Sequence, residues 1–248
     1  MYSDILKDLL LSGVQWEINE NPNVPTYTNT TATKASDNTR ATTTIVPPIA
    51  PIQSVSQLTA VAMAARPTDI DSLCRMIGEF NHPLRRSVTN VVLPHIAPNP
   101  NGVVILTDMP SSDDDAVGKI LSGAVGELVD KMLESIEMSR DSVSICPMLF
   151  WRTPGGRTPL TQEIMLSRPF VDRVLEMLKP KIIITLGTLP AAEFGHIQLP
   201  KGHGTPVDTT IGAKIIPIYH PNYLLLKPSA KRDVWNALQN IQNLLKIV

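Results

Sequence analysis

The sequence is poor in cysteine, with only Cys74 and Cys146 among its 248 residues. Two thiols supply neither a disulfide framework nor a cysteine-rich metal site, and they are typical of a protein of the reducing cytoplasm. No run of eighteen apolar residues occurs, so we expect no transmembrane helix and no membrane partner. The N-terminal residues show no basic stretch followed by an apolar one, so we expect no signal peptide. Together these absences predict a cytoplasmic protein.

Net charge is also small, since 22 Lys and Arg nearly balance 23 Asp and Glu. A protein of this composition that binds nucleic acid must use a local basic patch, because its overall field is weak. The length of 248 residues suits one medium-sized domain with an additional segment.

The N-terminal part of the chain differs in composition from the rest. Residues 1–18 contain an amphipathic pattern from Asp4 to Leu11, which predicts a short N-terminal helix. Residues 19–53 are rich in Thr and Pro and lack the apolar side chains that would offset the entropy of ordering. We predict a disordered linker there, followed by one globular domain over residues 54–248.

Apolar segments alternate with helical patterns along the predicted domain. Four runs have the length and composition of strands covered on both faces: residues 103–106, 143–149, 181–186 and 214–219. Helical patterns cover residues 70–80, 126–136, 161–178, 189–194 and 229–245, three of them with predicted N-caps at Asp69, Thr161 and Ser229. The alternation predicts an α/β fold with three layers, α/β/α, around a central, mostly parallel, four-stranded sheet.

Four residues lie just past the ends of these predicted strands: Asp108, Trp151, Gly187 and His220. Ligands of parallel sheets bind beyond the carboxyl ends of the strands. We therefore expect these residues to converge on one crevice.

The C-terminal helix is predicted to begin with an unusual charge pattern. Lys231 and Arg232 fall in its first turn, where the helix dipole is already positive. Cations beside free N–H groups form an anion site, for which phosphate is the obvious ligand. The preceding segment is bracketed by Pro221 and Pro228, which predicts a shaped loop. Its leucines at 224–226 are similar to the apolar wedges that unstack bases, although leucines in the core and solvated cations are the alternative.

Residues His220 to Leu226, with Lys231, Arg232 and Trp235 after them, resemble the HPSYLLR…KR…W signature of the family 4 uracil-DNA glycosylases of bacteria and archaea. The resemblance extends upstream to residues 107–126, 147–159 and 183–189, and residues 88–90 are similar to the alphaproteobacterial branch. It implies a uracil-DNA glycosylase-like version of the predicted fold. It also implies hydrolysis of the N-glycosidic bond of a uracil that has been flipped out of DNA.

Two residues match the catalytic positions of that family. Asp108 matches the carboxylate that positions water or stabilises the sugar cation, and His220 matches the histidine that donates a hydrogen bond to the leaving base. Asp in place of Glu withdraws the carboxylate by about 1.5 Å, and a misplacement of about 1 Å can cost about a hundredfold in rate. The alternatives are a turn or N-cap carboxylate for Asp108 and an ordinary loop histidine for His220.

The resemblance places five residues in the base pocket: Met109, Pro110, Leu121, Pro147 and Asn222. Leu121 stands where the family has a stacking Phe, and Pro147 stands where it has an Asn that reads uracil. Leucine has no aromatic ring, and proline has neither a side-chain amide nor an N–H. A site that loses hydrogen bonds loses discrimination, so altered base specificity is expected.

The four cysteines that hold the family's iron–sulfur cluster correspond to Glu79, His82, Trp151 and Ser167. None of these is a thiolate, so we expect neither the cluster nor another metal. Trp151 is expected to fill part of that space as a core residue, and contact with DNA is the alternative for it.

Contacts with DNA are expected from seven residues: Arg152, Arg157, Tyr223, Leu224, Leu225, Lys231 and Arg232. Two functions stay open. One is an active, monomeric glycosylase that acts on uracil or another damaged base in single- or double-stranded DNA. The other is a catalytically impaired relative that binds DNA or a partner. A generic nucleotide-binding α/β protein is disfavoured, because no glycine-rich phosphate loop follows the first strand.

Overall fold

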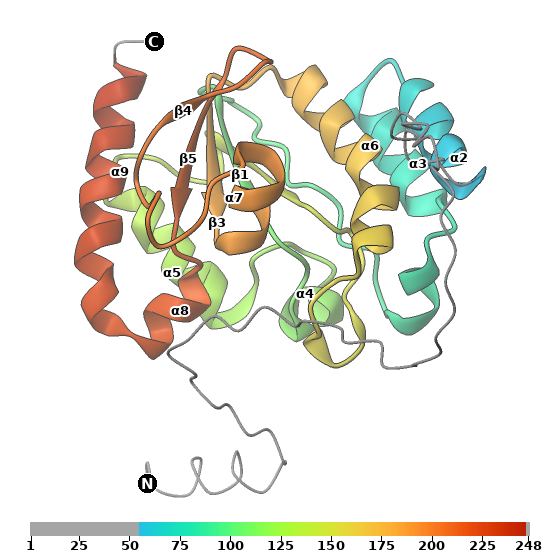
Figure 1. Ribbon diagram of the computed structural model, residues 1–248, viewed down its shortest axis with the longest axis horizontal. Coiled ribbons are helices and arrows are strands. Elements are labelled where there is room, and N and C mark those ends of the chain that lie inside the picture. Colours follow the sequence, from blue (N-terminus) through green and yellow to red (C-terminus); the bar gives the residue numbers. More distant parts are fainter. Residues whose placement is uncertain (1–54, 247–248) are drawn as a thin grey trace, which may run out of the picture. The chain divides into compact units, whose positions relative to one another are not determined.

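The computed structural model describes residues 55–246, and Figure 1 shows their helices and strands. The helix predicted within residues 1–18 and the linker predicted at residues 19–53 lie outside the described residues. Among residues 55–246, no helix combines the length and the apolar character needed to cross a membrane.

A five-stranded sheet in the order β2-β1-β3-β5-β4 forms the centre of the domain. Its longer strands are β1 (Val103–Thr107), β2 (Val143–Pro147), β3 (Ile182–Leu186) and β5 (Lys214–Ile218). They pair in parallel, which confirms the predicted mostly parallel sheet. The fifth strand, β4 (Val207–Asp208), is an antiparallel edge of two residues, too short to leave a recognisable apolar pattern in the sequence.

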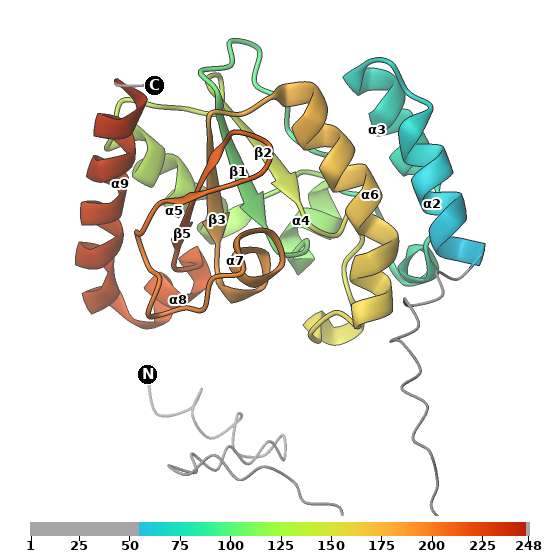
Figure 2. The ribbon, with the colours of Figure 1, turned by 45° about the horizontal axis from the view of Figure 1, so that its top comes forward.

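The strands place their side chains alternately in two cores. Val104, Leu106 and Ile183 face the core beneath α2 (Val55–Ala65), α3 (Ile70–Glu79), α6 (Thr161–Leu178) and α7 (Thr188–Gly195). Ile105 and Ile184 face the core beneath α5 (Gly123–Glu134), α8 (Pro221–Leu226) and α9 (Lys231–Leu245). Figures 1 and 2 show α2, α3 and α6 on one side of the sheet and α5 and α9 on the other. The three-layer prediction is confirmed, because both faces of the strands are covered.

Helices α3 and α6 lie at the predicted positions, but of their predicted N-caps only Asp69 is confirmed, because Thr161 is the first residue of α6 and Leu160 is its N-cap. Asp69 caps α3, and its Oδ1 accepts a hydrogen bond from the Ser72 N–H at 2.8 Å. The sequence does not predict α2, α4 (Ser112–Val117) or the short 3₁₀ turns η1 (Pro83–Ser87) and η2 (Pro154–Gly156). The α4 helix begins with a capping box: Ser111 Oγ accepts from the Asp114 N–H, and Asp114 Oδ2 accepts from the Ser111 N–H.

The segment between the two prolines was predicted as a loop, and this prediction is wrong. Pro221 is the first residue of α8, where the missing N–H costs nothing, and Pro228 begins the 3₁₀ turn η3 (Pro228–Ala230). The predicted N-cap at Ser229 is also wrong, because α9 follows η3 directly and its N-cap position is Ala230. The prolines therefore start helical turns in this segment instead of preventing them.

Candidate active site

A cavity of about 210 Å³ opens at the carboxyl ends of β1 and β5. Its wall includes six residues predicted for the catalytic or base-binding site: Asp108, Met109, Pro110, Leu121, His220 and Asn222. We call it the Asp108 cavity. Parallel strands end at one edge of a sheet, so segments that are distant in the sequence meet there. The predicted crevice thus contains Asp108 and His220, whereas Trp151 is fully buried in the core.

Asp108 and His220 lie next to each other in the wall of this cavity. Asp108 Oδ1 lies 3.6 Å from His220 Nε2, and the two side chains are 34% and 18% exposed. Asp108 Oδ1 also accepts a hydrogen bond from the Met109 N–H at 2.8 Å, which fixes the carboxylate at the end of β1. The Thr107 hydroxyl lies 3.4 Å from both Asp108 Oδ1 and His220 Nε2. Thr107 was not predicted as a site residue, and the structure places it at the end of β1, one residue beyond the predicted strand.

The hydrogen bonds of His220 indicate which ring nitrogen carries the proton. Nδ1 caps α8 by accepting a hydrogen bond from the Asn222 N–H at 3.2 Å, so this nitrogen is unprotonated. Nε2 is then the protonated nitrogen of the neutral ring, and it points toward Thr107 and Asp108. Burial lowers the pKa of His220, opposed by the nearby carboxylates of Asp108 and Asp114. The ring is therefore a neutral hydrogen-bond donor at neutral pH.

Gly187 allows His220 to take this position. Its φ of 91° lies in the region that favours glycine, and its N–H donates to the Ile218 carbonyl at 2.9 Å. A Cβ at Gly187 would lie 3.2 Å from His220 Cβ. The turn that leaves β3 thus packs directly against the histidine that follows β5.

Leu121 forms the wall of the cavity where the family has an aromatic residue. Its side chain is buried, and its backbone is left-handed, with a φ of 53°, which is uncommon for a leucine. Asp114 Oδ1 accepts a hydrogen bond from the Ser122 N–H at 2.6 Å, beside Leu121. A Cβ at Gly126 would lie 1.9 Å from the Leu121 carbonyl oxygen. The turn is therefore held tightly on two sides.

Arg140 also fixes the turn at Leu121, by hydrogen bonds to its carbonyl groups. Its Nη2 donates to the Leu121 carbonyl at 2.6 Å, its Nη1 donates to the Ile120 carbonyl at 3.0 Å, and its Nε donates to Asp130 Oδ1 at 2.7 Å. The planar guanidinium thus fixes two successive carbonyl groups at once. Neither Arg140 nor Asp114 was predicted from the sequence. For Asp114, the Ser111-x-x-Asp114 spacing of a capping box was a usable signal.

Pro147 does not line the Asp108 cavity, although it was predicted in the base pocket. It is the last residue of β2, fully within the sheet, and it pairs with Thr107. The next residue, Met148, donates its N–H to the Thr107 carbonyl at 2.8 Å. This position contributes to the alignment of β1 and offers no group to a bound base.

The predicted DNA contacts separate into exposed and buried residues. Tyr223 and Leu225 are 39% and 44% exposed, whereas Leu224 is 1% exposed and packs in the core. Leu224 is thus corrected to a core residue, because it faces inward from α8. Leu226, which was predicted as part of the leucine wedge but not among the seven DNA contacts, is 85% exposed. An apolar wedge on this helix would consist of Leu225 and Leu226.

The predicted basic contacts also differ, in whether a carboxylate of the protein already pairs with them. Arg157 donates from Nη1 to Glu163 Oε2 at 2.9 Å and from Nη2 to Glu163 Oε1, and this bidentate pairing lowers the pKa of Glu163. The guanidinium of Arg157 is therefore already paired with a carboxylate of the protein. Arg152 lines the Asp108 cavity, and Lys231 and Arg232 are exposed in the first turn of α9 as predicted. Asp233 shares that turn and reduces its positive charge.

The four positions that match the family's cluster ligands do not fit an iron–sulfur cluster. Glu79 is exposed, whereas His82, Trp151 and Ser167 are fully buried. The ring of His82 stacks on Trp151 at 4.3 Å with an interplanar angle of 2°. His82 Nε2 lies 3.1 Å from the Glu163 carbonyl, and Ser167 Oγ donates to the Met148 carbonyl at 2.7 Å. The stacked rings of His82 and Trp151 and the hydrogen-bonded hydroxyl of Ser167 occupy this part of the core. Burial also lowers the pKa of His82, because a charged ring is unfavourable there.

Residues 93–239 match the family model described as the uracil DNA glycosylase superfamily. The chain is 28% identical over 169 residues to the type-4 uracil-DNA glycosylase of Thermotoga maritima, which covers 66% of this chain and 88% of that protein. It is 30% identical over 170 residues to the Archaeoglobus fulgidus protein of the same name, with 65% and 85% covered. It is 32% identical over 141 residues to the Pyrobaculum aerophilum protein, with 53% and 72% covered. The chain belongs to the uracil DNA glycosylase superfamily.

Proposed function

We propose that this protein is a uracil-DNA glycosylase that hydrolyses the N-glycosidic bond of a flipped uracil in base-excision repair. The observation that carries this proposal is the 3.6 Å approach of Asp108 Oδ1 to His220 Nε2 in one cavity at the carboxyl edge of the sheet. The names of the relatives support it.

The chemistry follows from the two groups. When the C1′–N1 bond breaks, its electron pair stays with the uracil, and the Nε2–H of His220 stabilises that charge by a hydrogen bond to a base carbonyl. The negative charge of the Asp108 carboxylate stabilises the positive charge that develops on the sugar, and the carboxylate orients a water molecule. The water oxygen bonds to C1′, and its proton passes to the carboxylate. A neutral His220 suits this role, because it donates without requiring a proton from solvent.

Base recognition is the part of the site that departs most from the family pattern. Leu121 pads the cavity without an aromatic ring, and Pro147 is outside the wall. The exposed side-chain amide of Asn222 and the guanidinium of Arg152 are the polar groups of the wall that suit the edge of a pyrimidine. We therefore propose that uracil is accepted with weaker discrimination against other damaged bases.

DNA would be held across α8 and the start of α9. Tyr223, Leu225 and Leu226 present apolar surface beside the cavity, and Lys231 and Arg232 supply cations for phosphate groups. Both single-stranded and double-stranded DNA are substrates in this proposal. The domain would correspond to residues 54–248 and act as a monomer in the cytoplasm, in a protein of the alphaproteobacterial branch.

A catalytically impaired relative that binds DNA or a partner is the second candidate function. The absence of an amide at Pro147 and the shorter carboxylate of Asp108 favour it. In this case the phosphate contacts would persist without base release.

The test is release of uracil from a single-stranded and a duplex oligonucleotide under single-turnover conditions. We expect measurable release, which Asp108→Asn and His220→Ala each reduce by about a hundredfold or more. Asp141→Asn is the matched control, since Asp141 is an exposed carboxylate before β2, at the opposite end of the sheet. Release that is unaffected by both site variants contradicts the proposed roles. No release, with salt-sensitive DNA binding retained, supports the second candidate.

We also propose that the protein works without the family's iron–sulfur cluster. The His82–Trp151 stack and the absence of thiolates at the four positions support this. Purified protein should show no visible charge-transfer absorbance and no stoichiometric iron, and prolonged treatment with a chelator should leave uracil release unchanged. Iron bound at four equivalents per chain would contradict the proposal.

A further inference from the structure

A second cavity, of about 350 Å³, lies on the other side of His220. It is lined by Gly187 and Thr188 after β3, by Leu199 and Pro200, and by Tyr219, His220 and Tyr223. We call it the Tyr223 cavity. His220 belongs to the walls of both cavities, so a ligand in one lies next to a ligand in the other.

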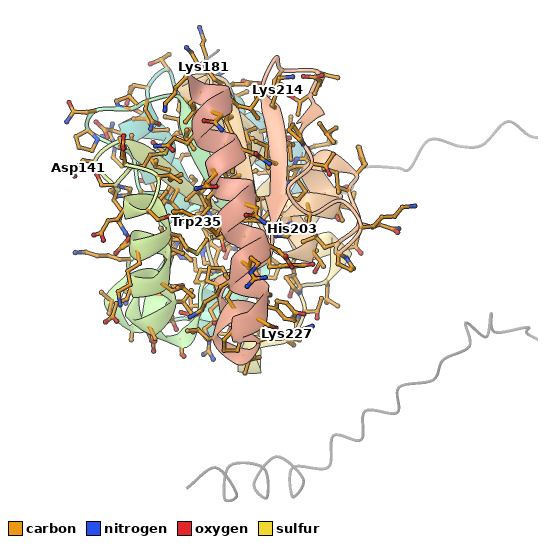
Figure 3. The ribbon with its side chains drawn as sticks, turned by 90° about the vertical axis from the view of Figure 1, so that its left-hand side faces the viewer. Asp141, Lys181, His203, Lys214, Lys227 and Trp235 are labelled. Carbon is orange, nitrogen blue, oxygen red and sulfur yellow. The ribbon has the colours of Figure 1, made fainter. Side chains whose placement is uncertain are left out.

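The wall of the Tyr223 cavity is aromatic and supported from behind. The rings of Tyr219 and Tyr223 are 5.1 Å apart, and His203 packs on Tyr219 at 4.1 Å. Figure 3 shows His203 beside α9. The Tyr219 ring is thus held between two rings, whereas Tyr223 is 39% exposed and has Lys227 Nζ over its ring. Such a fixed pair of rings is a platform for another planar group.

A positive charge lies over the exposed ring of this platform. Lys227 Nζ is 5.8 Å from the centre of the Tyr223 ring. Figure 3 shows Lys227 near the end of α9 at which that helix begins, where Lys231 and Arg232 are also exposed. An apolar, ring-lined hollow with a lysine over its outer ring and further cations at the start of α9 suits a nucleobase whose phosphate stays outside.

We propose that the Tyr223 cavity receives the nucleobase adjacent to the flipped uracil and stacks it on Tyr223. This inference rests on the proposed function, because the strand enters through the Asp108 cavity. The neighbouring nucleotide of that strand must lie within one nucleotide of His220, and the Tyr223 cavity begins at His220. The protein would therefore take two consecutive bases out of the stack, one for cleavage and one for holding the strand.

This arrangement favours single-stranded DNA. Each base taken out of a duplex costs unpairing and unstacking energy, whereas a single strand offers its bases at little cost. Stacking on an aromatic side chain tolerates any base, so the subsite would fix the strand without reading its sequence.

The experiment uses single-stranded oligonucleotides with one deoxyuridine, in which the residue on its 5′ or its 3′ side is either a normal nucleotide or an abasic tetrahydrofuran. With the wild-type protein, removing the base on one side should lower kcat/KM by about tenfold, and removing it on the other side should change little. Tyr223→Ala should lower kcat/KM by a similar factor on the normal strand and show no additional loss on the abasic strand. Tyr223→Phe, which keeps the ring, should retain the dependence of kcat/KM on the neighbouring base.

Ile211→Ala is the control, because Ile211 is an exposed apolar side chain outside both cavities. It should leave the dependence on the neighbouring base unchanged. Losses from Tyr223→Ala and from base removal that multiply on the same strand would overturn the proposal, because the ring and the base would then act independently. Equal activity of the wild type on all strands would overturn it as well.

A binding measurement separates this inference from the proposed function. The Kd of the Asp108→Asn variant for the same strands is measured by fluorescence anisotropy at one salt concentration. A Kd that rises about tenfold when one neighbouring base is removed, and that does so only when Tyr223 is present, supports the subsite even if no uracil is ever released. Release of uracil with a Kd that ignores both neighbours retains the function and overturns the subsite.

Discussion

His220 Nε2 and Asp108 Oδ1 lie 3.6 Å apart, and the Thr107 hydroxyl lies 3.4 Å from each of them. Three side chains from the ends of two strands thus share one small polar region. Since Nδ1 of the histidine is used by the Asn222 N–H, the remaining nitrogen has a single orientation available for a bound base. The backbone of α8 therefore sets the tautomer on which the chemistry depends.

The first prediction concerns the titration of His220. Burial lowers its pKa, so the ring should take up a proton only below the ordinary value of about 6.5. Protonation at Nδ1 also breaks the bond from the Asn222 N–H, which disfavours the charged form further. Ring proton signals followed by NMR between pH 8 and 5 should give a titration midpoint below 6.5. Above the pH range in which His220 titrates, its protonation should not change the rate of uracil release. A midpoint above 6.5 would contradict the prediction that burial dominates the pKa of His220.

The second prediction concerns the contact of Gly187 with His220. Gly187→Ala places a methyl group 3.2 Å from His220 Cβ and forces alanine into a φ of 91°. We expect uracil release to fall by about ten- to a hundredfold, because the histidine shifts by a few tenths of an ångström or more. The change is measured in single-turnover rates.

Gly212→Ala is the matched control for this substitution. Gly212 has a similar φ of 81° with nothing within 4 Å of the added methyl group. It carries the same backbone strain, of about 1–3 kcal/mol, far from the site. It should lower stability comparably and leave the rate unchanged. A loss of rate in both variants would mean that strain alone, and not the contact with His220, explains the effect.

The strands and the positions of Asp108 and His220 at the edge of the sheet follow from the sequence because their signals are local. Strands covered on both faces require continuous apolar runs, and a residue just past such a run is placed at the carboxyl edge. This rule places Asp108 and His220 at that edge together with Trp151, which is buried, and the resemblance to the family distinguishes the pair from the other residues. The path of the chain around Pro221 is not predicted by this rule, because a proline can either end a helix or begin one.

The remaining site residues depend on contacts that the sequence does not record. Arg157 has the same local pattern as a phosphate-binding arginine, yet Glu163 pairs with it. Leu224 and Leu225 are neighbours of the same type, and the direction of α8 alone decides that one is buried and the other exposed. Arg140 contacts a turn that precedes it by a whole helix, so no sequence spacing indicates its role.

The third prediction concerns the hold of Arg140 on the Leu121 turn. Arg140→Met removes three hydrogen bonds and leaves the Ile120 and Leu121 carbonyls without this donor. We expect a loss of about 1–3 kcal/mol of stability. We also expect KM for uracil-containing DNA to rise more than kcat falls, because the wall moves and the catalytic pair does not.

The controls for Arg140 distinguish an effect of lost stability from an effect of a displaced Leu121 turn. Ile241→Val, in the buried face of α9, should cost about 1 kcal/mol without changing KM. Arg140→Lys keeps the charge but not the fork, and should show an intermediate KM. If Ile241→Val raises KM as much as Arg140→Met does, the effect of Arg140 reflects stability alone.

The fourth prediction compares two tryptophans. Trp151 is fully buried, stacks on His82 and meets Phe80 and Phe150 at 6.1 and 5.7 Å, whereas Trp235 is 41% exposed on α9. Trp151→Ala should lower the free energy of unfolding by about 3–5 kcal/mol, and Trp235→Ala should lower it by about 1 kcal/mol or less. Urea denaturation measures both. Because the Trp151 ring occupies the corner that a metal cluster fills in the family, the large loss should be the same in the presence and absence of a chelator. A small loss for Trp151→Ala, or one that depends on iron, would show that the aromatic stack does not hold this corner together.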